Sequence, residues 1–333
     1  MKSILIVEAG VNHNGNLNLA KKLIDAAKMA GAEFIKFQFY NIEKMITPTA
    51  TKADYQKKNS RIKENQYKML KRLSLNKQEI KKLYKYSVKK KINFLLSVFD
   101  EESFDLDNSL NTKYIKIPSG EITNVPLLKK INKTKKKIIL STGASSLKEI
   151  KNALKILKFK INSKKLILLH CVSLYPTPIE KINLGSLVFL RKKLKIKVGL
   201  SDHTKDLNIP LYAIAMGAEV VEKHFTLNKK LKGPDHKASI NPKELTLLIK
   251  NIKKLELMIG YKNKERLIYK DEKKIKKVIR KSIYAKKLIK VGEKFSLKNL
   301  VTKRPDVGIS SSKWFDVIGT KSKFNFLPND KIK

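Results

Sequence analysis

Short apolar runs alternate with amphipathic segments through residues 1–262, and this alternation constrains the fold more than any other feature of the sequence. Apolar residues recur at helical spacing in residues 17–30, 77–90 and 147–157, among other segments. The runs between them have the length of buried strands and cover residues 4–8, 34–39, 94–99, 114–117, 137–140, 166–169, 196–200 and 219–222. Strands that alternate with helices in this way predict an α/β fold with a parallel sheet.

Eight strand–helix units in about 260 residues favour a closed (β/α)8 TIM barrel over an open doubly wound sheet. The open sheet usually carries a glycine-rich nucleotide-binding turn, and neither the G-x-G-x-x-G nor the Walker pattern occurs in this sequence. We therefore predict a catalytic barrel over residues 1–262. Residues 41–65 form a long polar connection within it, and such a connection in a compact domain is usually a functional loop.

The sequence pattern changes after Lys262. Residues 263–280 are highly charged and are predicted to form a linker. Residues 281–333 are rich in turn formers and short β-like runs, which predicts a small β-rich domain. A domain of this size buries little apolar surface alone, so we expect it to pack on another part of the protein.

The net charge of +45, from 74 basic and 29 acidic residues, invites a nucleic-acid or anionic-membrane interpretation. Two features weigh against it. Only six of the basic residues are arginine, the side chain best suited to bidentate phosphate contacts, and the lysines are spread over every helix-like segment. We therefore expect neither a nucleic-acid nor a membrane partner. A non-catalytic basic barrel that binds polyanions stays open as an alternative of another class.

The single cysteine, Cys171, cannot form a disulfide within the chain, which suits a reducing cytoplasm. The N-terminus lacks a signal-peptide core, and no run approaches the ~20 apolar residues that span a bilayer. A cytoplasmic location is therefore expected. Cys171 itself is predicted to be a packed thiol, because the adjacent His170 points to the opposite face of a strand.

Polar side chains follow the predicted strands at their carboxyl ends, where the active sites of such barrels lie. Apolar strands carry polar groups at a cost unless those groups are paired or used. The sequence therefore predicts a ring of polar residues at one rim of the barrel. Its members are Glu8, Lys36, Gln38, Asp100, Lys116, Ser119, Glu121, Ser141, Thr142, His170, Ser201, Asp202, His203, Glu222 and His224.

His203 and His224 each follow an apolar run, with a helical segment between the two runs. Consecutive parallel strands share their direction, so both imidazoles should lie at the same edge of the sheet. A lone histidine is more often a structural residue, but two at matching strand ends predict a metal site. His236, in the turn-forming sequence GPDH, is expected either to close over a ligand or to cap a helix.

Lys36 and Lys116 lie inside β-like runs, FIKFQF and YIKIPSGE. Lysines in the barrel interior suit the binding of a dianionic phosphate and a carboxylate, with nearby serine hydroxyls completing the oxygen-binding shell. Glu8 ends the first run and is expected to orient a sugar hydroxyl, or alternatively to form a salt bridge with a neighbouring lysine.

The motifs resemble those of the sialic acid synthase family, the phosphoenolpyruvate-dependent N-acylneuraminate synthases, which include legionaminic and pseudaminic acid synthases. They are EAGVNHNG at 8–15, KFQ at 36–38, KIPSGE at 116–121, STG at 141–143, HCVSLYPTP at 170–178, GLSDHT at 199–204, EKHFTL at 222–227, GPDHKAS at 233–239, and KRP with GIS at 303–310. They occur in the family's order through almost the whole chain. The resemblance implies a (β/α)8 barrel followed by a small antifreeze-like domain, called SAF.

The resemblance also implies roles for individual residues. His203 and His224 would bind a divalent metal, usually Mn²⁺ or Mg²⁺. Phosphoenolpyruvate would be bound by Lys36, Lys116, Ser119, Ser141 and Ser201. Glu8, Tyr175 and Asp235 would contact the amino sugar, and Glu222 would lie near the reacting centre. Arg304 would reach the partner's active site in a homodimer with a domain-swapped SAF domain, which makes Glu222, Glu8 and Arg304 the predicted catalytic residues.

The activity that the resemblance implies is condensation of phosphoenolpyruvate with N-acetylmannosamine, with phosphate released by C–O cleavage. The alternative is a legionaminic or pseudaminic acid synthase, whose N-acyl amino sugar is a diacetamido-trideoxyhexose. Ser173 stands where some of the family's makers of sialic acid carry asparagine. This departure bears on which acyl sugar is bound and leaves the reaction itself unchanged.

Overall fold

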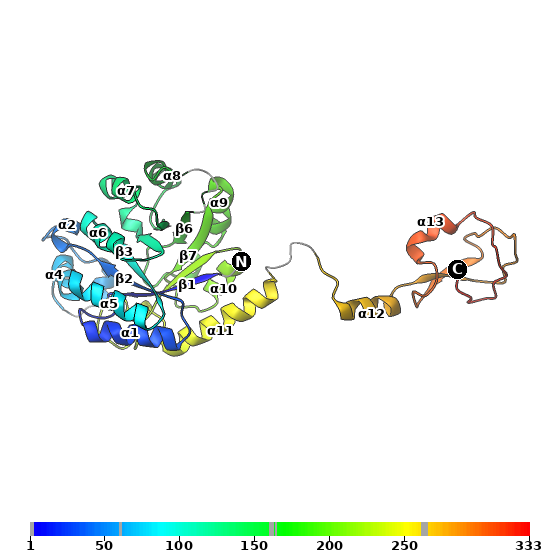
Figure 1. Ribbon diagram of the computed structural model, residues 1–333, viewed down its shortest axis with the longest axis horizontal. Helices are drawn as coiled ribbons and strands as arrows, with labels where there is room; N and C mark the ends of the chain where they lie inside the picture. Colours follow the sequence, from blue (N-terminus) through cyan, green and yellow to red (C-terminus); the bar gives the residue numbers. More distant parts are fainter. Residues whose placement is uncertain (1–2, 60–61, 160–162, 164, 261–265) are drawn as a thin grey trace. The chain divides into compact units, whose positions relative to one another are not determined.

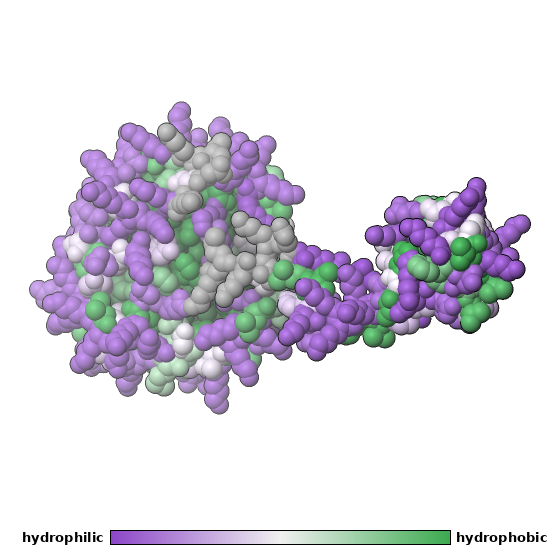
Figure 2. All heavy atoms as spheres, turned by 45° about the vertical axis from the view of Figure 1, so that its right-hand side comes forward, coloured by the Kyte–Doolittle hydropathy of each residue, from purple (hydrophilic) through white to green (hydrophobic). Residues whose placement is uncertain are grey.

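The structure is a computed structural model that describes residues 3–59, 62–159, 163, 165–260 and 266–333. It divides the chain into two compact units, Met1–Lys262 and Asn263–Lys333. Hydrophilic side chains cover most of the face of each unit seen in Figure 2, and apolar ones are scattered among them. Among the described residues, no helix has the length and apolar character needed to cross a membrane.

The first unit is a closed barrel of eight parallel strands in sequence order, with the last strand paired to the first, which confirms the predicted (β/α)8 fold. Helices surround the strands in Figure 1. The strands are β1 Ile4–Gly10, β2 Phe34–Phe39, β3 Asn93–Val98, β4 Tyr114–Ile117, β5 Lys137–Ser141, β6 Leu166–Cys171, β7 Lys197–Asp202 and β8 Val220–His224. The helices that follow them include α1 Leu17–Met29, α5 Lys77–Lys89, α6 Glu101–Ser109, α7 Val125–Ile131, α8 Leu147–Ile156, α9 Gly185–Leu194, α10 Ile209–Ala215 and α11 Pro242–Ile259.

Several strands extend beyond the apolar runs that predict them. β6 continues to Cys171, β7 to Asp202 and β8 to His224, so their polar ends are still paired within the sheet. A search for apolar runs stops too early at these strands, because the polar residues at the strand ends face the barrel interior or are buried against neighbouring loops. The predicted polar connection at residues 41–65 also contains regular structure, α2 Ile42–Met45 and α3 Asp54–Asn59, and is followed by α4 Gln66–Leu73.

The barrel interior is arranged in two layers, because alternate residues of each strand point inward. The lower layer is apolar and almost fully buried; it consists of Ile6, Phe34, Leu95, Tyr114, Ile139, Ile167, Leu169 and Val220. Two residues further along their strands come Glu8, Lys36, Ser97, Lys116, Ser141 and Glu222. The intervening residues of the strands pack outward against the helices in two larger apolar clusters. Charged side chains are therefore held above a layer of packed hydrocarbon.

The second unit is small and contains one two-stranded antiparallel sheet, β9 Ser282–Ala285 with β10 Leu300–Lys303. Isolated bridges such as Ile289 with Phe326 add further β-type pairing. Its apolar cluster consists of Ile283, Ala285, Ile289, Phe295, Leu300, Val317, Phe326 and Ile332. The helix α13 Trp314–Val317 contributes to that cluster. The segment predicted as a linker contains α12 Lys270–Ile279, while its residues 263–265 lie outside the described residues.

Candidate active site

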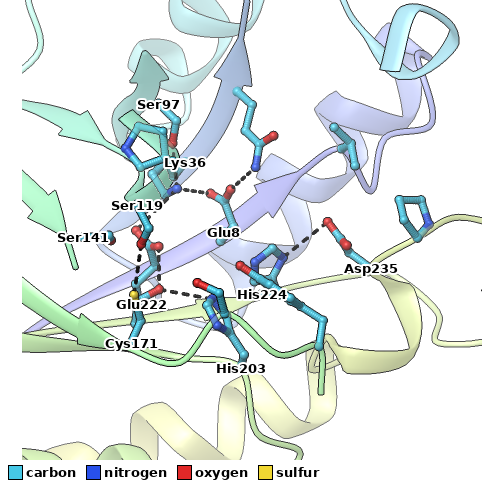
Figure 3. A pocket seen from close by; sticks show the side chains of 18 of the residues that line it. Glu8, Lys36, Ser97, Ser119, Ser141, Cys171, His203, Glu222, His224 and Asp235 are labelled. Carbon is cyan, nitrogen blue, oxygen red and sulfur yellow. Dashed lines mark hydrogen bonds and ion pairs between the residues drawn. The ribbon is translucent and has the colours of Figure 1, made fainter. Parts of the chain in front are cut away.

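A cavity of about 250 Å³ opens at the carboxyl ends of the barrel strands. Its walls bring together eleven of the predicted site residues: Glu8, Lys36, Lys116, Ser119, Ser141, Tyr175, Ser201, His203, Glu222, His224 and Asp235. Figure 3 shows Glu8, Lys36 and Glu222 pointing toward one another, with His203 and His224 beside them. These side chains come from distant parts of the sequence, and the closed barrel brings them together in one pocket.

Two lysines and two carboxylates form the centre of the site. Lys36 Nζ lies 2.9 Å from Glu8 Oε2 and 3.4 Å from Glu222 Oε2, and Lys116 Nζ lies 3.7 Å from Glu222 Oε1. All four side chains are at most 5% exposed. Each lysine also donates to a hydroxyl, Lys36 to Ser97 Oγ at 2.8 Å and Lys116 to Ser141 Oγ at 2.7 Å.

The charge states of this cluster follow from burial and pairing. Burial alone would raise the pKa of Glu222, but Lys116 and Lys36 outweigh it and hold the pKa at about 2. Burial raises the pKa of Glu8, which Lys36 partly opposes. Burial likewise lowers the pKa of Lys116, whereas the pKa of Lys36 is raised because Glu222 and Glu8 together outweigh its burial. Glu222 is therefore the firmly ionised carboxylate of the pair.

His203 and His224 lie next to each other, with ring centroids 5.6 Å apart. His203 Nδ1 lies 2.7 Å from the carbonyl oxygen of Val172, so Nδ1 carries the proton and Nε2 keeps its lone pair. His224 Nδ1 is buried without a hydrogen-bond partner in the described chain, 3.8 Å from Asp235 Oδ2. Burial lowers the pKa of both rings, so both are neutral.

Two neutral imidazoles with available nitrogens fit a divalent metal ion, since metal-binding histidines usually donate their other ring nitrogen to an oxygen. The described residues include no group of three or more His, Cys, Asp and Glu side chains suited to a metal ion. A metal held by His203 and His224 would thus take its remaining ligands from water or substrate.

Asp235 and Tyr175 complete the side of the pocket next to the imidazoles. Burial, with a smaller effect of Glu8, raises the pKa of Asp235 to about 7. The Tyr175 ring packs on His203 with 4.1 Å between centroids and meets His224 edge-on at 5.7 Å. Arg304 belongs to the second unit, where it is exposed, and its role in a shared site stays a prediction.

Five residues expected in the polar ring do not line the pocket: Asp100, Glu121, Thr142, His170 and Asp202. The expectation was wrong for Thr142, His170 and Asp202 because adjacent residues along a strand point to opposite faces. Asp100 and Glu121 lie beyond the ends of their strands and bond within their own segments, Glu121 by accepting from Asn124 Nδ2 at 2.7 Å. Asp100 caps α6, accepting a hydrogen bond from Ser103 N at 2.8 Å. His170 Nε2 bonds to the Ile182 carbonyl at 2.8 Å, and Asp202 accepts from Lys223 Nζ at 2.5 Å.

His236 and Cys171 also differ in part from expectation. His236 neither reaches the pocket nor caps a helix with its side chain; it is fully buried and bonds to Thr226 Oγ1 at 2.7 Å. Cys171 is buried as predicted, but its thiol faces the pocket and lies 3.2 Å from Ser119 Oγ. Burial raises the pKa of this thiol, so it stays protonated and a poor nucleophile.

The pocket also contains side chains that sequence reasoning missed, notably Ser97, Tyr55, Gln56 and Leu70. Ser97 was predictable, because it follows the inward-facing Leu95 by two residues in β3. Tyr55 and Gln56 lie on α3, within the long connection at residues 41–65, and the length of that connection is the sequence signal for them. Leu70 lies on α4, directly after this connection.

The barrel and its pocket place buried lysines next to two neutral imidazoles, an arrangement typical of an enzyme for an anionic substrate. Comparison with known proteins shows its family. The chain belongs to the NeuB family, whose sequence profile matches residues 23–264. The sialic acid synthase family indicated by the motifs is thereby confirmed, and with it the prediction that the protein is an enzyme of the synthase type.

Individual relatives are similar along almost their whole length. The chain is 46% identical over 333 residues to the N,N'-diacetyllegionaminic acid synthase of Campylobacter jejuni, covering 100% of this chain and 99% of that protein. It is 39% identical to the N,N'-diacetyllegionaminic acid synthase of Legionella pneumophila, covering 98% and 92%. Among solved structures, N-acetylneuraminic acid synthetase of Leptospira borgpetersenii in complex with citrate superposes with a TM-score of 0.71 at 34% identity, covering 83% of this chain and 90% of that one.

Proposed function

We propose that this protein condenses phosphoenolpyruvate with a diacetamido-trideoxyhexose, forming a nine-carbon 2-keto acid and releasing phosphate. The observation that carries the proposal is the pocket in which Lys36 and Lys116 face Glu222 beside His203 and His224. The two relatives named above as legionaminic acid synthases favour this sugar over N-acetylmannosamine, the first expectation from the sequence.

The floor of the pocket suits phosphoenolpyruvate. Its phosphate and carboxylate carry the negative charge that two desolvated ammonium groups need, and charge-assisted hydrogen bonds are the strongest that such a site can form. The hydroxyls of Ser119, Ser141 and Ser201 supply further contacts. Ser119 Oγ accepts from Gly143 N at 2.8 Å, which orients the hydroxyl and leaves its proton for a substrate oxygen.

The proposed reaction forms one C–C bond and breaks one C–O bond. C3 of the enol attacks the aldehyde carbon of the open-chain sugar, and positive charge develops at C2. Glu222, ionised and held between the lysines, stabilises that charge through its carboxylate. Water then adds at C2, and its proton goes to the alkoxide formed from the aldehyde, with Glu222 positioned to relay it. The tetrahedral intermediate expels phosphate by cleavage of its C2–O bond, and the phosphate takes the proton of the C2 hydroxyl. Lys36 and Lys116 stabilise the charge of the leaving group.

His203 and His224 would hold the divalent ion, Mn²⁺ or Mg²⁺. When bound, such an ion supplies a Lewis acid for the aldehyde oxygen. Asp235, with a pKa of about 7, can hold or release a proton near the sugar at neutral pH. Glu8 and Tyr175 line the same region and are proposed to contact the sugar hydroxyls.

Two further parts of the proposal concern the second unit. We propose that residues 281–333 form the antifreeze-like SAF domain. We also propose that Arg304 completes the site of the partner chain in a domain-swapped homodimer. The exposure of Arg304 on its own unit supports this assignment, because the guanidinium remains available for a partner.

Phosphate release in the presence of phosphoenolpyruvate, Mn²⁺ and each sugar tests the proposal. The diacetamido-trideoxyhexose should give the highest kcat/KM. A higher kcat/KM with N-acetylmannosamine would favour the sialic acid synthase activity. The similarity to the Leptospira enzyme supports this second candidate. If no 2-acetamido sugar releases phosphate, the synthase proposal is wrong. Salt-sensitive polymer binding that persists without His203 and His224 would then favour the polyanion-binding alternative.

A further inference from the structure

The pocket has two chemically different ends, and only one of them has a role in the proposal above. The floor is charged and formed by strand residues. Beyond the strand ends the pocket is lined by Tyr55 and Gln56 on α3, Leu70 on α4, and Val11, which follows β1. We call these four residues the outer wall; three of their side chains are apolar or aromatic. Building on the proposed function, we infer that this outer wall, with Tyr55 at its centre, selects the sugar by the substituents on its far carbons.

The wall is fixed to the rest of the site by ring contacts. Tyr55 stacks on Tyr175 with centroids 4.9 Å apart and an interplanar angle of 26°, and Tyr175 in turn packs on His203. Burial, followed by the nearby charge of Asp235, raises the pKa of Tyr55, so its hydroxyl remains protonated. The position of Tyr55 is therefore set by the same residues that surround the reacting end of the sugar.

Hydrogen bonds hold the two short helices that carry the wall. Gln56 Oε1 accepts from Ala53 N at 3.0 Å, and Gln56 Nε2 donates to the Tyr55 hydroxyl at 3.3 Å. The Tyr40 hydroxyl donates to the Leu70 carbonyl at 3.0 Å, which ties α4 to the end of β2. Gln56 is only 8% exposed. A wall held in this way presents a defined surface to a ligand.

The reaction fixes the orientation of the sugar. Its aldehyde carbon must meet the enol carbon of phosphoenolpyruvate, which the lysines hold at the floor. The remaining carbons of the open chain then extend toward the mouth and reach the outer wall. The floor cannot tell the two candidate sugars apart, because both present an aldehyde next to an acetamido group.

The two sugars differ at the carbons that face the wall. The diacetamido-trideoxyhexose carries a second acetamido group and a terminal methyl where N-acetylmannosamine carries hydroxyls. The transfer of these two methyl groups from water to the surface of Tyr55 and Leu70 lowers the free energy of binding. Hydroxyls at the same places would lose their hydration with few partners in return. The wall therefore favours the diacetamido sugar.

The test compares kcat/KM for both sugars in the wild type, Tyr55→Ala, Tyr55→Phe and Leu70→Asn, at saturating phosphoenolpyruvate. Tyr55→Ala and Leu70→Asn should lower kcat/KM for the diacetamido sugar roughly tenfold or more and change that for N-acetylmannosamine much less, so selectivity falls. Tyr55→Phe keeps the ring and should keep the selectivity. Tyr212→Ala, a tyrosine 54% exposed on α10, is the matched control.

Each outcome decides the inference. If both sugars lose the same factor in both Tyr55→Ala and Leu70→Asn, or if neither changes, the wall does not select the sugar, and the inference is wrong while the proposed function stands. The KM for phosphoenolpyruvate and the thermal midpoint show whether a variant has lost its fold. If Tyr55→Ala does not fold, Leu70→Asn provides the test. If the wild type releases phosphate with neither sugar, the proposed function is wrong and this inference falls with it.

Discussion

Replacing Glu222 by glutamine removes the only carboxylate that faces both buried lysines of the described site, and the structure allows the cost to be worked out. Lys36 and Lys116 would keep their charges in a desolvated pocket with Glu8 alone to oppose them. A fall in the pKa of Glu222 from 4.5 to about 2 corresponds to about 3 kcal/mol of stabilisation by the charged form. Breaking a buried ion pair on one side costs about 3–5 kcal/mol, and the lowered pKa of Lys116 favours the lower end of this range.

The effect should depend on pH with a defined sign. A carboxyl group whose pKa is lower in the folded state stabilises the protein above its unfolded pKa, and this stabilisation is lost as the pH falls through the folded pKa. The wild type should therefore exceed Glu222→Gln in the free energy of unfolding by about 3 kcal/mol at pH 7 and by about 1.4 kcal/mol at pH 3. The loss falls between pH 4.5 and about 2, the two values of the Glu222 pKa.

Urea unfolding followed by far-ultraviolet circular dichroism is the appropriate assay. The signal reports the barrel helices, whereas the single tryptophan, Trp314, lies in the second unit. Urea is uncharged and does not screen the ion pairs. Glu101→Gln is the matched control, because Glu101 is 56% exposed and pairs with Lys130 at 3.6 Å, a surface contact worth at most about 1 kcal/mol. A Glu222→Gln protein as stable as the wild type, or a difference that does not change with pH, would refute the reasoning.

Three further predictions concern the proposed reaction. His203→Ala and His224→Ala should each abolish turnover, and each should abolish the rise in thermal midpoint that Mn²⁺ gives the wild type. His170 lies outside the pocket, so His170→Ala should keep the Mn²⁺-induced rise. An unchanged rise in the two site variants would contradict the metal assignment. Ser141→Ala removes the hydroxyl that accepts a hydrogen bond from Lys116 Nζ at 2.7 Å. The loss of about 1 kcal/mol of binding free energy should raise the KM for phosphoenolpyruvate about fivefold. A change confined to the KM for the sugar would contradict the assignment of this end of the pocket. Mixing Arg304→Ala chains with His224→Ala chains should restore part of the activity through mixed dimers, and no restoration would exclude a site shared between chains.

The barrel and its inward-facing residues could be predicted because both follow from periodicity. Ile6 and Glu8, like Val220 and Glu222, are two residues apart on strands that the apolar runs identify, so each pair points into the barrel. His170 and Cys171 show the limit of this reasoning. An apolar run that ends at residue 169 does not reveal how the strand continues, and one residue decides which of the two faces the pocket.

Tyr55 and Gln56 were missed for a different physical reason. They lie on α3, a short helix of mostly polar sequence with no clear apolar face. Tyr55 contacts Tyr175, which is distant in the sequence, and Gln56 contacts Gln66 on α4. Such tertiary contacts leave no periodic signal. The parts of the site that come from strands are therefore predictable, and the parts that come from loops are not.

The hydrocarbon layer beneath the lysines has a kinetic consequence. Ile6, Leu95, Ile139 and Val220 are at most 1% exposed, so no passage leads to the site from below. If the proposed reaction takes place, both substrates have to enter from the other side, and the one that binds deeper has to arrive first. This predicts a compulsory order in which phosphoenolpyruvate associates before the sugar and inorganic phosphate departs after the nine-carbon acid, so phosphate should inhibit competitively against phosphoenolpyruvate.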